Sequence, residues 1–122
     1  MEKCILIYDD DVEILTVTKI ILEKHHYHVE TRTRCDDILK EVGEIKADLV
    51  FMDLWIPRMG GESALKLMKE NEPTRHIPVI LFSANDLIEE VCKRSHADGY
   101  LKKPFSINNL LQLVENTISE KH

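Results

Sequence analysis

The stretch that decides the fold is residues 4–11, Cys4-Ile5-Leu6-Ile7-Tyr8-Asp9-Asp10-Asp11. Its first five side chains are apolar or aromatic, without the polar alternation of a strand that has one face in water. Continuous hydrophobicity over this length is typical of a parallel strand that helices cover on both faces. The sequence therefore predicts a buried first strand, and an acidic run that stops it.

Four further strands are expected, because short apolar runs alternate with segments of helical period. They are residues 28–32, 47–52, 78–82 and 100–101. The 28–32 run alternates polar and apolar residues, so we expect it at an edge of the sheet. This rhythm predicts an α/β fold with a five-stranded parallel sheet and helices on both faces.

Two of the intervening helices carry cap signals. Asp10 or Asp11 is placed to cap the first helix, and Asp36 or Asp37 the second. Gly43 is a candidate end for the second helix, because glycine adopts the left-handed conformation that ends many helices. Taken alone, an acid at the start of a helix is more often a cap than a metal ligand.

Length and cysteine content favour a single domain that spans residues 1–122. Hydrophobic residues make up 43% of the chain, enough for a core without disulfides or a structural metal. Cys4, Cys35 and Cys92 are odd in number and lack CxxC spacing, which argues against a secreted disulfide scaffold and a zinc module. A reducing cytoplasm fits these thiols better.

Charge and hydrophobicity disfavour two classes of partner. The formal net charge is −6, with 16 Lys and Arg against 22 Asp and Glu, and the basic residues are scattered singly or in pairs. Such a surface repels nucleic acid. No apolar run approaches the ~18 residues that cross a bilayer, so we expect neither a membrane span nor a signal peptide.

Chemically active side chains gather at the predicted carboxyl ends of the strands, where an open parallel sheet forms its functional crevice. They are Asp9, Asp10, Asp53, Ser83 and Lys103. With an ordinary pKa of ~3.9 the three aspartates are ionised at neutral pH, so bringing them together calls for a cation. Oxygen ligands suit Mg²⁺ or Mn²⁺ rather than zinc. Such an ion, with a hydroxyl and an ammonium opposite, can hold a phosphoryl group.

Four motifs occur together in an order and spacing that are highly specific. They are Ile5-Leu6-Ile7-Tyr8-Asp9-Asp10-Asp11, Met52-Asp53-Leu54-Trp55-Ile56-Pro57-Arg58-Met59-Gly60-Gly61, Phe82-Ser83-Ala84 and Gly99-Tyr100-Leu101-Lys102-Lys103-Pro104-Phe105. With them the sequence resembles the response-regulator receiver domains of two-component signalling, and is similar to the chemotaxis receiver, over nearly all of its length. The resemblance implies a doubly wound, flavodoxin-like fold with strand order 2-1-3-4-5.

The resemblance also implies roles for the acidic residues. Asp53 matches the phosphoacceptor, the carboxylate that takes a phosphoryl group from a phosphohistidine. Asp10 matches the direct Mg²⁺ ligand, and Asp9 the acid that helps to hold the ion largely through water. Trp55 matches the position whose backbone carbonyl completes the coordination.

Further positions match the family's catalytic and switch residues. Lys103 matches the lysine that pairs with the phosphate and the acceptor carboxylate, and its bond to Pro104 is cis in the family. Ser83 matches the switch hydroxyl that moves to bond a phosphoryl oxygen, and Tyr100 the aromatic that turns inward with it. His96 stands where the family often has glycine, a residue that tolerates positive φ.

We therefore expect a signalling phosphoacceptor rather than a turnover enzyme. Its phosphodonor would be a histidine kinase or a histidine phosphotransfer protein, in a Mg²⁺-dependent reaction. Residues 1–122 leave no room for a DNA-binding or enzymatic output domain. The output is thus expected through a downstream protein target, unless a longer parent chain was trimmed.

Two other functions stay open. A haloacid-dehalogenase-type phosphatase also uses an aspartate nucleophile, Mg²⁺, a hydroxyl and a lysine, but its DxD motif follows the first strand, whereas Asp53 follows the third and lacks the second acid. A receiver-fold binding module that no longer accepts phosphate is the other alternative. Among single residues, Tyr100 could simply plug the sheet edge, and Trp55 could cover apolar surface instead of shielding the site.

Overall fold

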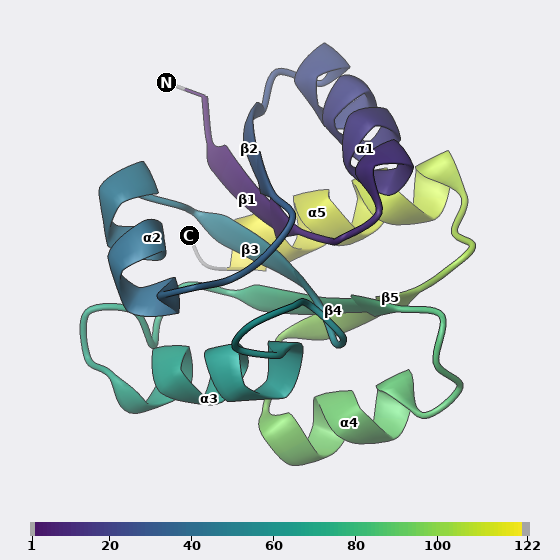
Figure 1. Cartoon of the computed structure of the whole chain (residues 1–122). Helices are drawn as coiled ribbons and strands as arrows, with labels where there is room; N and C mark the ends of the chain where they lie inside the picture. The colour runs from purple at the N-terminus through teal and green to yellow at the C-terminus, as the bar shows by residue number, and fades with distance from the viewer. Residues whose placement is uncertain (1, 121–122) are drawn as a thin grey trace.

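The computed structural model describes residues 2–120, which form one parallel sheet flanked by helices (Figure 1). The elements are β1 (Cys4–Tyr8), α1 (Val12–Lys24), β2 (His28–Arg32), α2 (Ile38–Ile45), β3 (Leu49–Asp53), α3 (Gly61–Glu70), β4 (Val79–Ser83), α4 (Ile88–Ser95), β5 (Gly99–Lys102) and α5 (Ile107–Glu120). The strand order is β2-β1-β3-β4-β5, with β2 at an edge. The predicted fold and strand order are confirmed. Among residues 2–120, no helix has both the length and the hydrophobicity that a bilayer-spanning segment needs.

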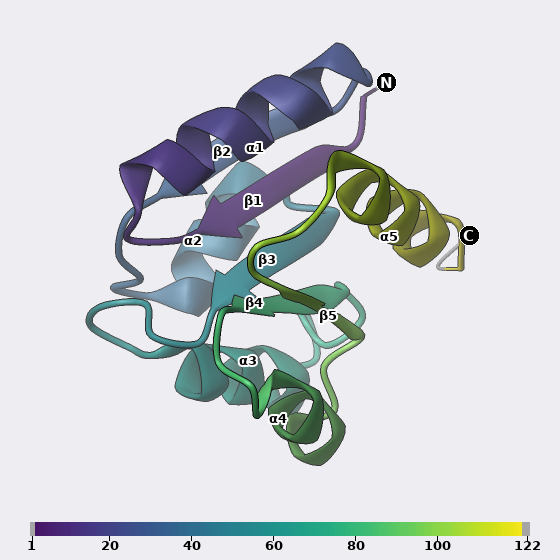
Figure 2. The same cartoon turned by 90° about the vertical axis from the view of Figure 1, so that its right-hand side faces the viewer.

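Helices cover both faces of the sheet, as the continuous hydrophobicity of β1 requires. The helices α1 and α5 lie on one face, and α2, α3 and α4 on the other (Figures 1 and 2). Along β1, Ile5 and Ile7 join the core under α1 and α5, whereas Leu6 and Tyr8 join the core under α2, α3 and α4. All four side chains are fully buried. The period-two alternation of a strand thus divides one apolar run between two cores.

The strands that carry the candidate residues end later than the sequence pattern indicates. The predicted 47–52 strand is β3, which begins at Leu49 and includes Asp53, and the predicted 78–82 strand is β4, which includes Ser83. Both residues are in the ladder, because Asp53 pairs with Phe82 and Ser83 pairs with Lys102. The sheet therefore fixes the backbones of both residues directly.

The predicted end of the second helix at Gly43 is wrong. The helix α2 continues to Ile45, whose side chain packs against the core. Lys46 then ends it in the left-handed conformation at φ 60°, with its N–H donating to the carbonyl of Val42 at 2.9 Å. His96 ends α4 in the same conformation at φ 61°, which explains why glycine would suit that position.

The structure also decides between the alternative caps. Asp11 caps α1, because its carboxylate accepts from the N–H of Glu13 at 2.9 Å. Asp37 caps α2 by accepting from the N–H of Lys40 at 3.3 Å. Since Asp11 provides the cap of α1, the capping role does not account for Asp10.

Thr18 in α1 offers a test of packing. Its side chain is fully buried, and its hydroxyl oxygen has no hydrogen-bond partner among the described residues. A buried hydroxyl without a partner costs about 1–3 kcal/mol. Thr18→Val keeps the shape and should raise the free energy of unfolding in urea by about 1 kcal/mol. Thr16→Val is the control and should bring no gain, because the Thr16 hydroxyl is exposed and donates to Val12; equal stability of Thr18→Val and wild type would contradict the prediction.

Candidate functional site

Four parallel strands bring the candidate residues to one edge of the sheet, since all of them end on the same side (Figure 2). Asp9 directly follows β1, and Asp53 is the last residue of β3. Ser83 ends β4, and Lys103 directly follows β5. The residues predicted from their positions at strand ends are therefore neighbours in space.

Three carboxylates meet at this edge. One oxygen from each of Asp9, Asp10 and Asp53 lies within 4.8 Å of the others. Asp9 and Asp53 are buried, whereas Asp10 is exposed at the rim. An all-oxygen set with one side open to water fits Mg²⁺ or Mn²⁺ and gives no nitrogen or sulfur ligand for zinc.

The ammonium of Lys103 lies among these acids. Its Nζ forms an ion pair with Asp9, lies 3.8 Å from Oδ2 of Asp53, and sits 4.6 Å from the centre of the Phe82 ring. The resemblance implies a pair with the acceptor carboxylate, and the structure adds Asp9 as the nearer partner. Because Asp9 is fully buried, its charge most needs a counter-ion. Three carboxylates and one ammonium leave a formal charge of −2, which a divalent cation would neutralise.

Asp53 is held by the backbone of its own loop. The N–H of Trp55 donates to Oδ1 of Asp53 at 3.1 Å, which leaves Oδ2 on the side of Lys103. Burial raises the pKa of the Asp53 carboxyl, and the charges of Asp9 and Asp10 add to the rise. The Trp55 amide and the Lys103 ammonium oppose the rise in pKa without cancelling it. The raised pKa therefore comes mainly from the loss of water around the Asp53 carboxylate.

Ser83 and Lys103 are linked through their backbones. The N–H of Lys103 donates to the carbonyl of Ser83 at 2.9 Å. The hydroxyl oxygen of Ser83 accepts from the N–H of Asn85 at 3.0 Å, a bond that uses a lone pair and not the hydroxyl hydrogen. The Lys103–Pro104 bond is cis, as the resemblance implies.

The two aromatic candidates differ from the other site residues in exposure. The side chain of Tyr100 on β5 is 37% exposed, so it does not plug the sheet edge in this conformation. Trp55 is 70% exposed beside Asp53 and covers little surface of the core. Both are therefore free to contact a ligand or partner.

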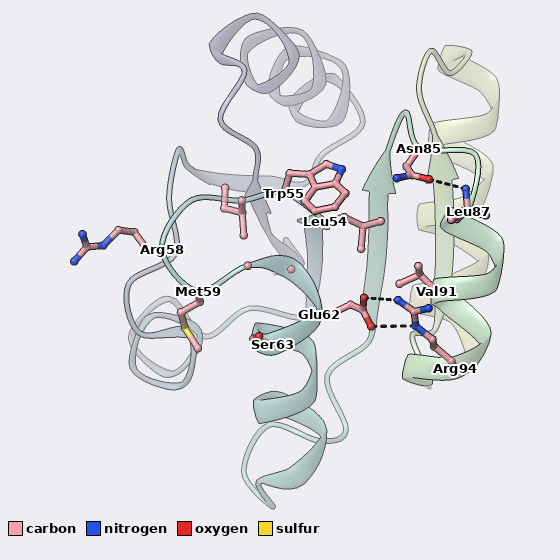
Figure 3. A pocket seen from close by; sticks show the side chains of 13 residues that line it. Leu54, Trp55, Arg58, Met59, Glu62, Ser63, Asn85, Leu87, Val91 and Arg94 are labelled. Carbon is pink, nitrogen blue, oxygen red and sulfur yellow. Dashed lines mark hydrogen bonds and ion pairs between the residues drawn. The ribbon is translucent and has the colours of Figure 1, made fainter.

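A cavity of about 420 Å³ lies beside the loop after Asp53, between α3 and α4 (Figure 3). Leu54, Trp55 and Leu87 line it near the acidic edge. Farther along, Arg94 donates to the carboxylate of Glu62 at 2.7 and 3.3 Å and ties α4 to α3. None of the three clustered carboxylates lines the cavity, so it is a neighbour of the acidic site and not part of it.

Sequence reasoning missed two supports of the Asp53 loop. Gly61 packs directly on the Asp53 peptide. From the sequence, the pair Gly60-Gly61 predicts only a loop and not this contact. The buried hydroxyl of Tyr8 donates to Glu41 at 2.6 Å. A signal for the second support was present, since a tyrosine in an aliphatic strand needs a hydrogen-bond partner, but the pattern does not say which residue provides it.

The family model described as "Response regulator receiver domain" matches residues 5–115 of the chain. The chain belongs to this family. Receiver domains are the phosphoacceptor modules of two-component signalling, and the fold and the acidic edge agree with that role. The match decides in favour of the receiver family over a phosphatase of the haloacid-dehalogenase type.

The receiver domain resembles proteins of several kinds. The "Probable transcriptional regulator ycf29" of Cyanophora paradoxa is 33% identical over 120 residues, covering 94% of this chain and 56% of that protein. PilG of Pseudomonas aeruginosa is 28% identical, covering 91% of this chain and 84% of that protein. The first three curated relatives are matched over 56%, 26% and 24% of their own lengths, so the receiver domain spans about half of them or less.

Among solved structures, the receiver domain of the sensor histidine kinase PA1611 of Pseudomonas aeruginosa is 26% identical with a TM-score of 0.87. The match covers 98% of this chain and 99% of that one. That structure has a magnesium ion coordinated in its active site cleft.

Proposed function

We propose that this receiver domain accepts a phosphoryl group on Asp53 from the phosphohistidine of a histidine kinase or a histidine phosphotransfer protein. The observation that carries the proposal is the convergence of three carboxylates within 4.8 Å beside the Lys103 ammonium. A buried carboxylate beside one fixed cation can attack phosphorus once further positive charge offsets the neighbouring acids.

The residues that would hold Mg²⁺ or Mn²⁺ are Asp9, Asp10, Asp53 and the carbonyl of Trp55. When bound, the ion supplies positive charge that neutralises the acids and the transferred phosphoryl oxygens. The magnesium in the active site cleft of the PA1611 receiver supports a bound metal here, as does the formal charge of −2 at the acidic edge.

Asp53 performs the covalent step. Its Oδ1 is engaged by the Trp55 amide, so Oδ2 is the attacking oxygen. A bond forms between Oδ2 and phosphorus while the bond from phosphorus to the donor's imidazole nitrogen breaks. That nitrogen keeps the electron pair and takes a proton, and Asp53 becomes an acyl phosphate. Lys103, already 3.8 Å from Oδ2, pairs with the new phosphoryl oxygens.

Ser83 and Tyr100 would carry the signal outward. The Ser83 hydroxyl donates to a phosphoryl oxygen, and Tyr100 turns inward from its half-exposed position. This movement changes the surface over β5 that a downstream protein target contacts. We propose the reducing cytoplasm as the place of this action, and the free thiols of Cys4, Cys35 and Cys92 support that proposal.

Removal of the metal tests the proposal. With a small acyl phosphate and Mg²⁺, the protein should gain one phosphoryl group per chain, measured by intact mass. With a chelator in place of Mg²⁺, the rate should fall about 100-fold or more, because metal charge supplies several kcal/mol in such transfers. Equal rates in both conditions would contradict the metal's role, and no mass gain in either would favour the binding module that accepts no phosphate.

A further inference from the structure

The loop between β3 and α3, residues 54–60, is tied to the segment between β2 and α2, residues 33–37. An isolated parallel bridge joins Cys35 to Arg58. Within it, the N–H of Cys35 donates to the Pro57 carbonyl at 3.1 Å, and the N–H of Met59 donates to the Cys35 carbonyl at 3.1 Å. The loop that follows Asp53 is therefore held by a distant part of the chain.

The conformation of this loop needs outside support. Arg58 adopts φ 82°, a left-handed conformation that costs an L-residue with a side chain about 1–2 kcal/mol. Its guanidinium Nε donates to Asp36 at 3.1 Å, within the same 33–37 segment. Residues 33–37 thus stabilise a conformation of the 54–60 loop that the loop's own sequence disfavours.

One carboxylate holds that segment in turn. Oε2 of Glu41, in the first turn of α2, accepts from the N–H of Asp37 at 3.0 Å and from the N–H of Asp36 at 3.3 Å. Its Oε1 accepts from the hydroxyl of Tyr8 at 2.6 Å. Glu41 therefore connects α2, the 33–37 segment and the end of β1.

Tyr8 is the residue directly before Asp9 and is fully buried. A buried phenol needs a hydrogen-bond partner, and Glu41 supplies it by accepting from the Tyr8 hydroxyl at 2.6 Å. Through this bond the strand end that carries Asp9 is fixed to the segment that supports the loop after Asp53.

We propose that Glu41 is a positioning residue for the acidic site. It touches none of the three clustered carboxylates, and it fixes the distance between the β1 end, with Asp9 and Asp10, and the β3–α3 loop, with the Trp55 carbonyl. The inference rests on the proposed function, in which the acidic site binds Mg²⁺ or Mn²⁺. Residues that orient metal ligands from outside the coordination sphere typically change metal affinity 10–100-fold.

The test compares Glu41→Ala with three other variants of the full chain. Tyr8→Phe removes only the hydroxyl and keeps the core filled. Glu41→Gln is the rescue, because its amide oxygen can accept from the two N–H groups while its NH₂ donates to Tyr8. Glu44→Ala is the matched control, since Glu44 lies on the same helix, is exposed, and forms an i,i+4 ion pair with Lys40.

Two measurements are made on each variant at a temperature where circular dichroism shows it folded. Without metal, amide hydrogen exchange at Met59 reports the bridge to Cys35. Calorimetric titration with Mg²⁺ alone reports the site. In Glu41→Ala and Tyr8→Phe we expect faster exchange at Met59 and about tenfold weaker Mg²⁺ binding. Glu41→Gln and Glu44→Ala should stay within about twofold of wild type.

The outcomes separate the inference from the function on which it rests. If the wild-type protein binds Mg²⁺ and Glu41→Ala and Tyr8→Phe bind it with the same affinity, the inference is overturned and the proposed function is not. This holds even if both variants lose stability. Unchanged exchange at Met59 would overturn it as well. A wild-type protein that takes up no Mg²⁺ would overturn the proposed metal site and the inference together.

Discussion

Asp53→Asn should abolish the phosphoryl mass gain that the wild-type receiver domain acquires from a small acyl phosphate and Mg²⁺. The substitution keeps the size of the side chain and an oxygen that can accept from the Trp55 amide at the present 3.1 Å. It replaces the attacking carboxylate oxygen by an uncharged amide, which is a far poorer nucleophile toward phosphorus. We expect at least a 100-fold lower yield of phosphoprotein in intact mass measured after the same incubation.

Asp86→Asn is the matched control for this experiment. Asp86 is exposed, pairs with Lys102 and lies outside the acidic cluster, so its loss should leave the mass gain intact. An undiminished gain in Asp53→Asn would reject Asp53 as the acceptor. Steady release of phosphate from a phosphomonoester by the wild-type protein would contradict a phosphoacceptor that lacks turnover.

Gly61→Ala should destabilise the fold and disturb the site at once. A Cβ at residue 61 would lie 2.5 Å from the carbonyl oxygen of Asp53 and 2.7 Å from Cα of Leu54. Both are backbone atoms, which cannot rotate away as a side chain can. The N–H of Gly61 also donates to the Leu54 carbonyl at 3.0 Å, so α3 begins in direct contact with the Asp53 peptide.

We expect Gly61→Ala to lower the free energy of unfolding in urea by about 2–3 kcal/mol, the upper range for overpacking. The rate of phosphorylation should fall as well, since small displacements of a reacting group are costly. Gly43→Ala is the opposite control. Apart from the neighbouring residues and backbone of α2 itself, no described atom lies within 4 Å of a Cβ at that position, so alanine should stabilise the helix by about 1 kcal/mol. Similar stability of the two variants would show that α3 can move away from the loop at little cost.

Much of the fold follows from the hydrophobic pattern. Four apolar runs and one alternating run predict the strands, and the alternation in residues 28–32 predicts the edge position of β2. Errors are confined to the ends of elements. At Gly43 the pattern predicts a stop, but the packing of the partly buried Ile45 against the core favours a longer helix, and Lys46 adopts the left-handed conformation instead. Packing thus overrides a local preference of the backbone.

The acidic edge could be predicted for a similar reason. In a parallel sheet all strands end on one side, so residues that follow strands must meet there whatever their separation in sequence. Asp9, Asp53, Ser83 and Lys103 are placed by this rule, and the resemblance adds an expected role for each. The proximity of the carboxylates is a property of the topology, and the chemistry that we assign to them is a proposal.

The sequence by itself determined the α/β layering, the parallel sheet and which polar side chains stand at its carboxyl edge, because these depend on periodicity along the chain. Only the tertiary structure decided that Lys103 pairs with Asp9, 94 residues away, and that Tyr8 finds Glu41, 33 residues away. It also decided that Gly61 must lack a side chain. Such partners are selected by the packing of helices and loops on the sheet, and no local pattern encodes which distant atom will fill a given contact.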